Sequence, residues 1–166
     1  MKKPRPVEPS ALRLENQLCF ALYTASRALT RAYQPLLAPL GLTYPQYIVM
    51  LVLWEGDGLS VSQLGARLAL DSGTLTPLLK RLEDNGIVER RRDANDERVV
   101  RLFLTASGRA LHGRALSIPG ELACRAGYEP DAAGLKSLNR LREALEALTR
   151  RLDDASTGRG CEADDP

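Results

Sequence analysis

Cysteine and tyrosine are the residue types whose spacing in this chain could do redox chemistry. Cys19 lies in the segment LENQLCFALY, on or beside the apolar stripe of an expected helix, and Tyr23 follows four residues later on the same face. No lysine or arginine lies within a turn of Cys19, and the helix is expected to begin two turns earlier. A reactive thiolate there would need hydroxyl donors, which on an apolar background are tyrosines. A buried, inert thiol is the alternative.

Tyr33 and Tyr44 are the other candidate donors. Tyr33 is fourteen residues after Cys19, which a straight helix places about 21 Å away at 1.5 Å per residue. Tyr33 therefore cannot reach Cys19 of its own chain. In a two-fold dimer with antiparallel first helices, Tyr33 and Tyr44 of one subunit could lie over Cys19 of the other.

Two long amphipathic helices are expected to position these residues. The first runs from Ala11 to about Tyr33, and Pro35 and then Pro39 end it. The second begins at Asp131. Their stripes contain Leu14, Leu18, Leu22, Ala25 and Leu29 in the first, and Leu135, Leu138, Leu141, Leu145, Leu148 and Leu152 in the second. Because this is more apolar surface than one small domain can cover, packing between subunits is expected.

Residues 59–104 contain the pattern of a helix-turn-helix. Ser60 and Gln63 form a capping box for a short helix, and a second apolar period is closed by Asn85-Gly86, an expected left-handed stop. If Thr74 caps the second helix, Pro77 falls in its first turn, where proline costs little. Its outward residues are small polar groups and two cations, which suit the DNA major groove. They are Ser72, Gly73, Thr74, Thr76, Pro77, Lys80 and Arg81.

Two expected strands, Val88–Asp93 and Val99–Leu104, form a β-hairpin that follows the second helix as a wing. Its cations are placed to meet phosphates or enter a narrow minor groove. Arg90, Arg91 and Arg92 lie at its base and Arg98 at its tip. Seven basic and seven acidic residues cancel between positions 71 and 101. DNA binding must therefore depend on where the cations lie, with Asp84, Asp93 and Asp96 turned away or pairing locally; the alternative is an ordinary solvated surface.

The composition of the chain limits which other classes of protein it could belong to. A net charge of +2 is too small for a polybasic binder, and a 44% hydrophobic content suffices for a core. The three cysteines form no CxxC motif and there is one histidine, so no metal site, catalytic centre or cofactor is predicted. The apolar run 47–54 is too short to cross a bilayer, which predicts a cytoplasmic protein without a membrane partner.

The chain divides into five expected regions around a mainly helical fold with a small β-hairpin wing. They are a flexible arm (1–10), an N-terminal dimerisation helix (11–40), a winged helix-turn-helix (41–104), C-terminal dimerisation helices (105–152) and a disordered acidic tail (153–166) that contains Cys161.

The order of these elements, with the segment NGIVERRRDANDERVVRLFLTASG, closely resembles the multiple antibiotic resistance regulator (MarR) family. The resemblance covers roughly residues 14–152. It implies an obligate homodimer that binds a pseudo-palindromic, double-stranded operator. Asp96 and Arg98 fall on the family's wing residues, of which the arginine is the usual minor-groove contact.

A closer resemblance comes from Cys19, Tyr33 and Tyr44 together with LDSGTLTPLLKRLE, which look like the organic hydroperoxide resistance regulators. This resemblance implies that an organic hydroperoxide oxidises Cys19 to a sulfenic acid. It further implies a resolving disulfide with Cys124 of the partner subunit, because Cys124 falls where two-cysteine members carry that thiol.

These features predict a homodimeric repressor that leaves its operator on oxidation and derepresses a peroxide-detoxifying gene. The first alternative keeps DNA binding, with a phenolic or other apolar ligand as signal and Cys19 inert. The second, from another class, is a thiol peroxidase. It is disfavoured because no cation is placed to stabilise the leaving oxygen, so the chain is not predicted to be an enzyme.

Overall fold

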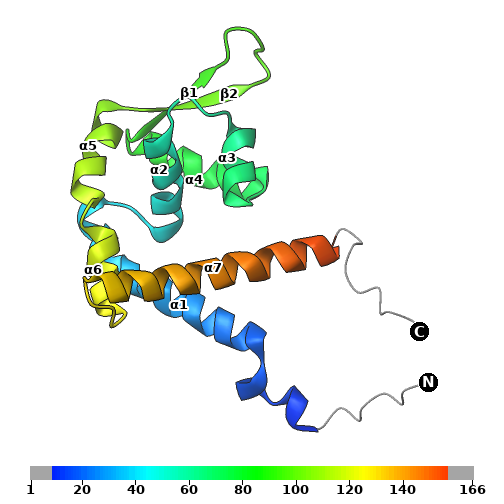
Figure 1. Ribbon diagram of the computed structural model, residues 1–166. Coiled ribbons are helices and arrows are strands. Elements are labelled where there is room, and N and C mark those ends of the chain that lie inside the picture. The colour runs from blue at the N-terminus through cyan, green and yellow to red at the C-terminus, as the bar shows by residue number, and fades with distance from the viewer. Residues whose placement is uncertain (1–8, 157–166) are drawn as a thin grey trace. The chain divides into compact units, whose positions relative to one another are not determined.

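The computed structural model describes residues 9–156 (Figure 1), so the expected N-terminal arm up to residue 8 and the tail from residue 157, with Cys161, lie outside the described residues. The chain forms two compact units, divided between Leu116 and Ser117, and each is described by itself. Helices predominate, and the first unit also contains one two-stranded antiparallel sheet, between α4 (Ser72–Asp84) and α5 (Ala106–Ala115). The predicted fold class, mainly helical with a hairpin wing, is confirmed.

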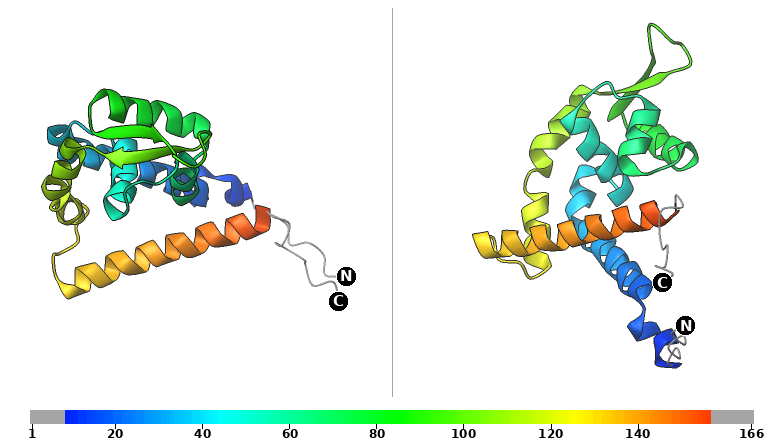
Figure 2. Two further views of the ribbon diagram at one scale, coloured as in Figure 1. Left: turned by 90° about the horizontal axis from the view of Figure 1, so that it is seen from above. Right: turned by 45° about the vertical axis from the view of Figure 1, so that its right-hand side comes forward.

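The described residues of the first unit contain three short 3₁₀ segments, five α-helices and the hairpin, and Figure 2 shows their ribbon from two further directions. In chain order they are η1 (Pro9–Leu12), η2 (Leu14–Asn16), α1 (Leu18–Leu37), η3 (Ala38–Leu40), α2 (Tyr44–Glu55), α3 (Val61–Leu68), α4 (Ser72–Asp84), β1 (Val88–Arg92), β2 (Val100–Leu104) and α5 (Ala106–Ala115).

Helix α2 is the centre of the core because its sequence is apolar nearly all round. Tyr47, Val49 and Met50 are at most 2% exposed, and the inward leucines of α4 and the wing are buried with them. Burial of each large side chain contributes on the order of 2 kcal/mol. Trp54, at the end of α2, is half-buried, and its indole Nε1 donates to the Gly108 carbonyl oxygen at 3.0 Å.

The helix-turn-helix forms as its capping signals predict. The Ser60 backbone N–H donates to the Gln63 side chain at 2.8 Å, and the Ser60 hydroxyl accepts from the Gln63 backbone N–H at 3.1 Å. Gly86 follows α4 with φ +66°, a conformation that glycine adopts without a Cβ clash. The capping box and the left-handed stop are therefore confirmed.

The hairpin pairs Val88 with Leu104 at its base and Arg92 with Val100 near its tip. Both strands are one residue shorter at the tip than expected, because Asp93 turns the chain. Its Oδ1 accepts the backbone N–H groups of Asn95 and Asp96 at 2.9 and 3.2 Å. Asp93 is thus a turn residue rather than the last residue of a strand.

The expectation of one helix from Ala11 is wrong. Gln17 is extended, with φ −89° and ψ 122°, and its side-chain amide donates to the carbonyl oxygens of Ala11 and Arg13. That amide competes with helical backbone bonds, so α1 begins at Leu18. Pro35 does not end the helix either, since α1 continues to Leu37 and Gly41 reverses the chain with φ +69°.

The second unit contains α6 (Ile118–Arg125) and α7 (Ala132–Asp154). Asp131 caps α7 by accepting the Gly134 backbone N–H at 2.7 Å. Helix α7 has no buried residue, and Leu135, Leu141, Leu145 and Leu152 are 59, 49, 42 and 56% exposed.

No single described helix is long and apolar enough to cross a membrane. Only a pair of segments, Leu18–Leu40 with Tyr44–Glu55, reaches the required length and hydropathy together, and a bend of 68° separates them. In the first unit, α1 leaves Leu18 and Leu29 60 and 41% exposed. Both long helices therefore carry apolar side chains that the described residues do not cover.

Candidate thiol site and DNA-binding surface

Cys19 lies in the first turn of α1, as its second residue, and both Cys19 and Cys124 are free and exposed. The predicted distance of two turns from the start of the helix is therefore wrong, because the helix starts after Gln17. The first-turn N–H groups of a helix have no intrahelical acceptor and interact favourably with negative charge. Cys124 is in α6, within the second unit.

The Tyr33 and Tyr44 rings lie together, 4.9 Å apart between centroids, at the other end of α1. Tyr47 is 5.5 Å from Tyr33 and makes the cluster a group of three. Burial first, and then the neighbouring Tyr47 and Tyr44, raise the pKa of Tyr33 to about 12. Burial also raises the pKa of Tyr44. Both hydroxyls therefore stay protonated at neutral pH, and within residues 9–156 neither has a hydrogen-bond partner.

The only local indication that Tyr47 belongs to this cluster is its position three residues after Tyr44 on α2. The Tyr47 ring also lies 6.3 Å from Trp54, whose indole is 5.5 Å from the His112 ring. His112 is exposed and makes this ring contact.

Tyr23 has a partner of its own in α1. Its hydroxyl accepts a hydrogen bond from Arg27 Nη1 at 3.2 Å, and the Arg27 guanidinium lies 5.4 Å from the Tyr23 ring centroid. Tyr23 is also 57% exposed. It therefore differs from Tyr33 and Tyr44, whose hydroxyls are unengaged.

Helix α4 is capped by Asp71 rather than by Thr74. Asp71 Oδ1 accepts the Thr74 backbone N–H at 2.8 Å and Oδ2 accepts the Thr74 hydroxyl at 3.1 Å. These bonds, the backbone one first, lower the pKa of Asp71. Pro77 is consequently the sixth residue of α4 and not part of its first turn. Having no N–H, Pro77 leaves the Gly73 carbonyl without its helical donor.

The outward face of α4 has fewer free donors than its residue types indicate. The Thr76 hydroxyl donates to the Ser72 carbonyl oxygen at 2.6 Å, as the Thr74 hydroxyl does to Asp71. Both threonines can therefore offer methyl groups and acceptors to a ligand, but not their hydroxyl protons. Lys80 and Arg81 are exposed and form no ion pair within the described chain. Among the predicted DNA contacts on α4, these two cations and the Ser72 hydroxyl remain available donors.

Most of the wing arginines are paired within the protein. Arg90 Nε donates to Glu83 at 2.7 Å, and Arg91 Nε donates to Glu89 at 2.7 Å while its guanidinium faces the Phe103 ring at 4.9 Å. Arg92 Nη1 reaches the Glu97 carbonyl oxygen at 3.3 Å. The local pairing that the zero net charge required is thus present.

Arg98 stands at the tip of the wing with a side chain 90% exposed. Its Nε and Nη2 atoms donate to the two carboxylate oxygens of Asp96, each at 3.0 Å. This bidentate pair, through its hydrogen bond first, lowers the pKa of Asp96. Asp96 therefore holds the guanidinium instead of being turned away.

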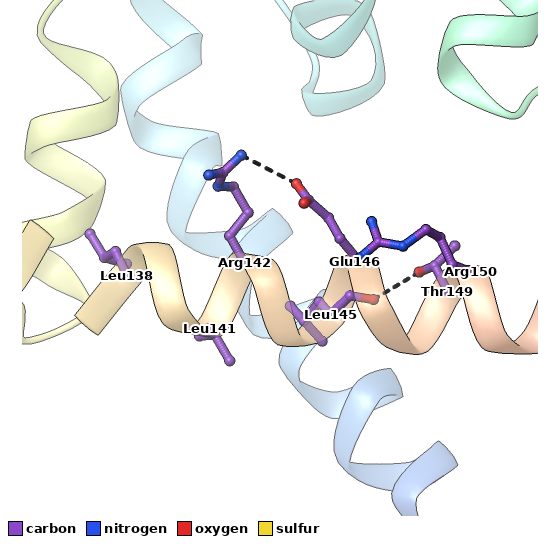
Figure 3. Close-up of a pocket in the computed structure, with 7 residues that line it drawn as sticks. All are labelled: Leu138, Leu141, Arg142, Leu145, Glu146, Thr149 and Arg150. Carbon is purple, nitrogen blue, oxygen red and sulfur yellow. Dashed lines mark hydrogen bonds and ion pairs between the residues drawn. The ribbon is translucent and has the colours of Figure 1, made fainter. Parts of the chain in front are cut away.

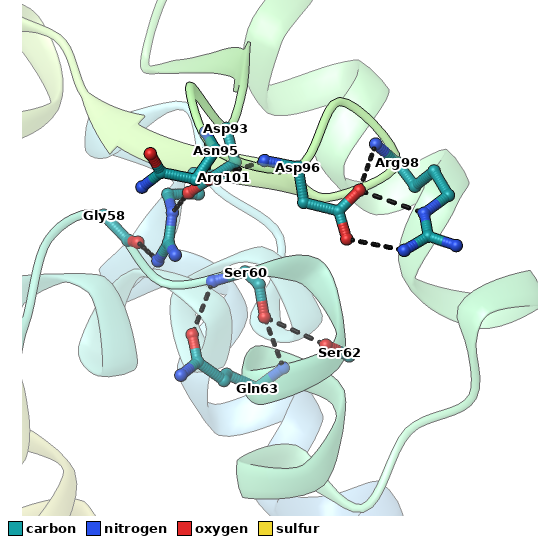
Figure 4. Close-up of polar contacts among 9 residues, drawn as sticks. All are labelled: Gly58, Ser60, Ser62, Gln63, Asp93, Asn95, Asp96, Arg98 and Arg101. Atoms are coloured by element: carbon teal, nitrogen blue, oxygen red, sulfur yellow. Dashed lines mark hydrogen bonds and ion pairs between the residues drawn. The ribbon is translucent and has the colours of Figure 1, made fainter.

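The contacts that attach the wing to the rest of the first unit were not predicted from the sequence. The Arg101 side chain bonds Asp93 and also donates to the Gly58 carbonyl oxygen at 3.1 Å (Figure 4). Asp57 accepts the Leu104 backbone N–H at 2.8 Å and Arg109 Nη1 at 2.7 Å. These residues are distant in sequence from their partners, so no local pattern indicates the contacts.

The family described as Transcriptional regulator SarA/Rot matches residues 31–113. The chain is 54% identical over 136 residues to the HTH-type transcriptional regulator TtmR of Methylorubrum extorquens, covering 81% of this chain and 70% of TtmR. It is 45% identical over 141 residues to the organic hydroperoxide resistance transcriptional regulator of Bacillus subtilis, covering 85% and 92%.

Among solved structures, reduced AbfR bound to DNA is similar with a TM-score of 0.72 and 33% identity, covering 88% of this chain and 99% of AbfR. AbfR, from Staphylococcus epidermidis, has also been solved with its disulfide formed. The chain therefore belongs to the MarR family of winged-helix transcriptional regulators, in the branch of the organic hydroperoxide resistance regulators.

Proposed function

We propose that this regulator is a homodimeric repressor that releases its operator when an organic hydroperoxide oxidises Cys19. The observation that carries the proposal is the pair Tyr33 and Tyr44, two protonated hydroxyls without an acceptor among the described residues. A thiolate of a second subunit would supply that acceptor. The name of the Bacillus subtilis relative and the reduced and disulfide structures of AbfR support a thiol signal.

The chemistry of the signal needs only the thiols and the oxidant. The Cys19 thiolate attacks one oxygen of the hydroperoxide, the O–O bond breaks, and the alkoxide leaves as an alcohol after taking a proton. Cys19 becomes a sulfenic acid. The Cys124 thiolate of the partner subunit then attacks the Cys19 sulfur, and hydroxide leaves as water after taking a proton. The balance is one hydroperoxide and two thiols converted to one alcohol, one disulfide and one water.

The partner that brings the thiol to the tyrosines is a second copy of the chain. Figure 3 shows Leu141 and Leu145 on one side of α7, with Arg142 and Glu146 on another, paired at 3.3 Å. The leucine side is at least 42% exposed at both positions. An apolar stripe of this length is typical of a subunit interface. A homodimer would cover it together with the exposed leucines of α1.

In the dimer, α4 of each subunit would enter the major groove of one half-site, and Arg98 would reach the minor groove beside it. The two recognition helices must match half-sites about one DNA turn apart. An intersubunit disulfide would change that spacing. A loss of 3 kcal/mol in binding free energy would lower affinity about a hundredfold or more, so a small rotation suffices to release the operator.

The test is the affinity of the reduced protein for duplex DNA from its own promoter, repeated after stoichiometric cumene hydroperoxide and again after dithiothreitol. Tight binding, loss on oxidation and recovery on reduction are expected. Cys19→Ser should bind DNA normally and keep binding after oxidant, and Cys161→Ser is the matched control that should respond like the wild type. A Cys19→Ser protein that is still released by oxidant would overturn the thiol mechanism.

A hollow in the first unit favours a second candidate function, release by a bound apolar ligand. It lies among α3, α4 and the wing, and its volume is about 570 Å³. Its lining includes apolar side chains such as Val61, Leu75 and Val100. Release of the reduced Cys19→Ser protein by a phenolic acid would favour this function. Catalytic turnover of hydroperoxide, rather than one event per subunit, would instead identify a thiol peroxidase.

A further inference from the structure

We propose that Arg101 and Asp93 are positioning residues that hold Arg98 in its DNA-binding place without contacting DNA themselves. The proposal rests on the proposed DNA binding by the wing. A continuous chain of polar contacts runs from the segment before α3 to the tip of the wing, as Figure 4 shows. In order, its members are Gly58, Arg101, Asp93, Asp96 and Arg98.

The inner end of this chain is anchored in the helix-turn-helix. Arg101 Nη1 donates to the Gly58 carbonyl oxygen at 3.1 Å. The main chain reinforces this contact, since the Leu102 N–H donates to the Leu59 carbonyl oxygen and the Gly58 N–H to the Leu102 carbonyl oxygen, both at 2.9 Å. The residue that follows this segment is Ser60, which caps α3. Arg101 is therefore fixed relative to the start of α3 by side chain and backbone together.

The outer end of the chain sets the turn that carries Arg98. Asp93 Oδ2 bonds Arg101, and its Oδ1 accepts the Asp96 backbone N–H at 3.2 Å. Asp96 in turn accepts the Arg98 backbone N–H at 3.0 Å and also accepts from Nε and Nη2 along one edge of the guanidinium. If Asp93 lost Arg101, the turn would keep its internal hydrogen bonds but lose its side-chain link to the segment before α3, and the two-stranded ladder would have to fix its direction. An isolated hairpin is marginally stable, so the tip would sample many directions.

Exposure separates the positioning pair from the DNA contact. The side chain of Asp93 is 12% exposed and that of Arg101 39%, whereas that of Arg98 is 90% exposed. Two of the three Arg101 nitrogens are occupied by protein acceptors. Arg98 also pairs with protein, but on the exposed tip, where phosphate oxygens can compete with Asp96. Arg101 consequently acts through Arg98.

The test is a double-mutant cycle of Arg98→Ala and Arg101→Gln, measured as operator affinity against salt concentration for the reduced full chain. Positioning predicts that each single variant binds about tenfold more weakly and lowers the salt slope by about 1, and that the double variant is no worse than Arg98→Ala. If Arg101 instead contacts a phosphate directly, the fold-losses in affinity of the two single variants should multiply in the double variant, and its salt slope should fall by about 2. That additive outcome overturns the proposal.

Asp93→Asn gives an independent test with a distinctive sign. It removes a negative charge from the wing, which by simple electrostatics strengthens binding to DNA. Positioning predicts the opposite, a loss of about tenfold, because the amide holds Arg101 less firmly. Unchanged or tighter binding by folded Asp93→Asn overturns the proposal.

Arg109→Gln is the matched control for a lost cation in the same unit, because Arg109 pairs with Asp57 outside this chain of contacts. It should bind operator within about twofold of the wild type. Circular dichroism checks that each variant is folded. Failure of the proposed function is distinguishable, since the wild type itself would then not bind or not respond to oxidant.

Discussion

Cys19 and Tyr33 belong to the same helix, and most of the length of α1 separates them. At 1.5 Å per residue their backbones are about 21 Å apart. Because no side chain spans that distance, any contact between this thiol and this hydroxyl must come from two different chains. The tyrosine cluster of one subunit and the cysteine of the other would form one site, so each dimer would have two.

The first prediction uses that arrangement. Tyr33→Phe should slow oxidation of Cys19 by about tenfold or more, because the thiolate loses a charge-assisted hydrogen bond, while operator affinity stays unchanged. Tyr23→Phe should have little effect, since the Tyr23 hydroxyl is exposed and engaged by Arg27. The measurement is the rate of sulfenic acid trapping after addition of hydroperoxide.

A mixed dimer decides whether the contact is between subunits. One subunit carries Cys19→Ser and the other Tyr33→Phe, so the remaining thiol faces an intact Tyr33 only across the interface. Oxidation at the wild-type rate is expected. A rate as slow as that of the Tyr33→Phe homodimer would place the tyrosine and the thiol within one chain and contradict the arrangement.

The second prediction concerns alkaline pH. The pKa of Tyr33 is raised from 10.0 to about 12, so the folded state holds the phenolic proton more tightly than the unfolded state. The stability from the neutral phenol is fully present below pH 10 and is lost as pH rises through about 12. Urea unfolding midpoints should therefore fall more steeply above about pH 10 in the wild type than in Tyr33→Phe. Parallel curves for the two proteins would contradict this shift.

The third prediction separates the two chemical steps. Cys124→Ser should still lose its Cys19 thiol to hydroperoxide but form no linked dimer on a non-reducing gel, because no resolving thiol remains. Excess oxidant should carry its Cys19 on to sulfinic acid, which mass spectrometry detects as two added oxygens. Cys161→Ser, the matched control, should form the linked dimer. A linked dimer in Cys124→Ser would show that another thiol resolves the sulfenic acid.

The fourth prediction follows from the start of α4 at Ser72. Pro77→Ala returns an N–H for the Gly73 carbonyl and should raise the free energy of unfolding, by at most about 3 kcal/mol. Pro45→Ala is the control, because Pro45 is the second residue of α2, where a helix needs no N–H. Urea unfolding of both variants gives the comparison. Destabilisation by Pro77→Ala would show that the proline stabilises this helix.

Local signals predicted the parts of the fold that depend on neighbouring residues. The pair Ser60 and Gln63 three residues apart, and Gly86 after a helical period, each predicted an observed helix end. Gln17 could not be predicted in the same way, because its amide competes with the backbone only in a particular rotamer. That competition moved the start of α1 by seven residues from Ala11 to Leu18 and brought Cys19 into the first turn.

The candidate site residues could be predicted where they lie on one helix. They were harder to predict where tertiary contacts determine which partner a side chain has. The outward face of α4 follows from its apolar period, but the engagement of the Thr74 hydroxyl by Asp71 does not. The Arg101–Asp93–Gly58 contacts link residues up to 43 positions apart. The packing of the wing on the helix-turn-helix determines these partners. Residue spacing within a local segment does not predict that packing.

The single tryptophan is an intrinsic fluorophore, so the protein needs no added fluorescent label. Trp54 lies one ring beyond Tyr47, at 6.3 Å, and Tyr47 lies 5.5 Å from Tyr33. Light absorbed by these phenols reaches the indole by energy transfer over such short separations, and its emission depends on how the rings are arranged. A thiolate lost from the tyrosine hydroxyls would change that arrangement. Stopped-flow fluorescence of the unlabelled protein would thus record the oxidation of Cys19 as it happens, from a residue on a different helix.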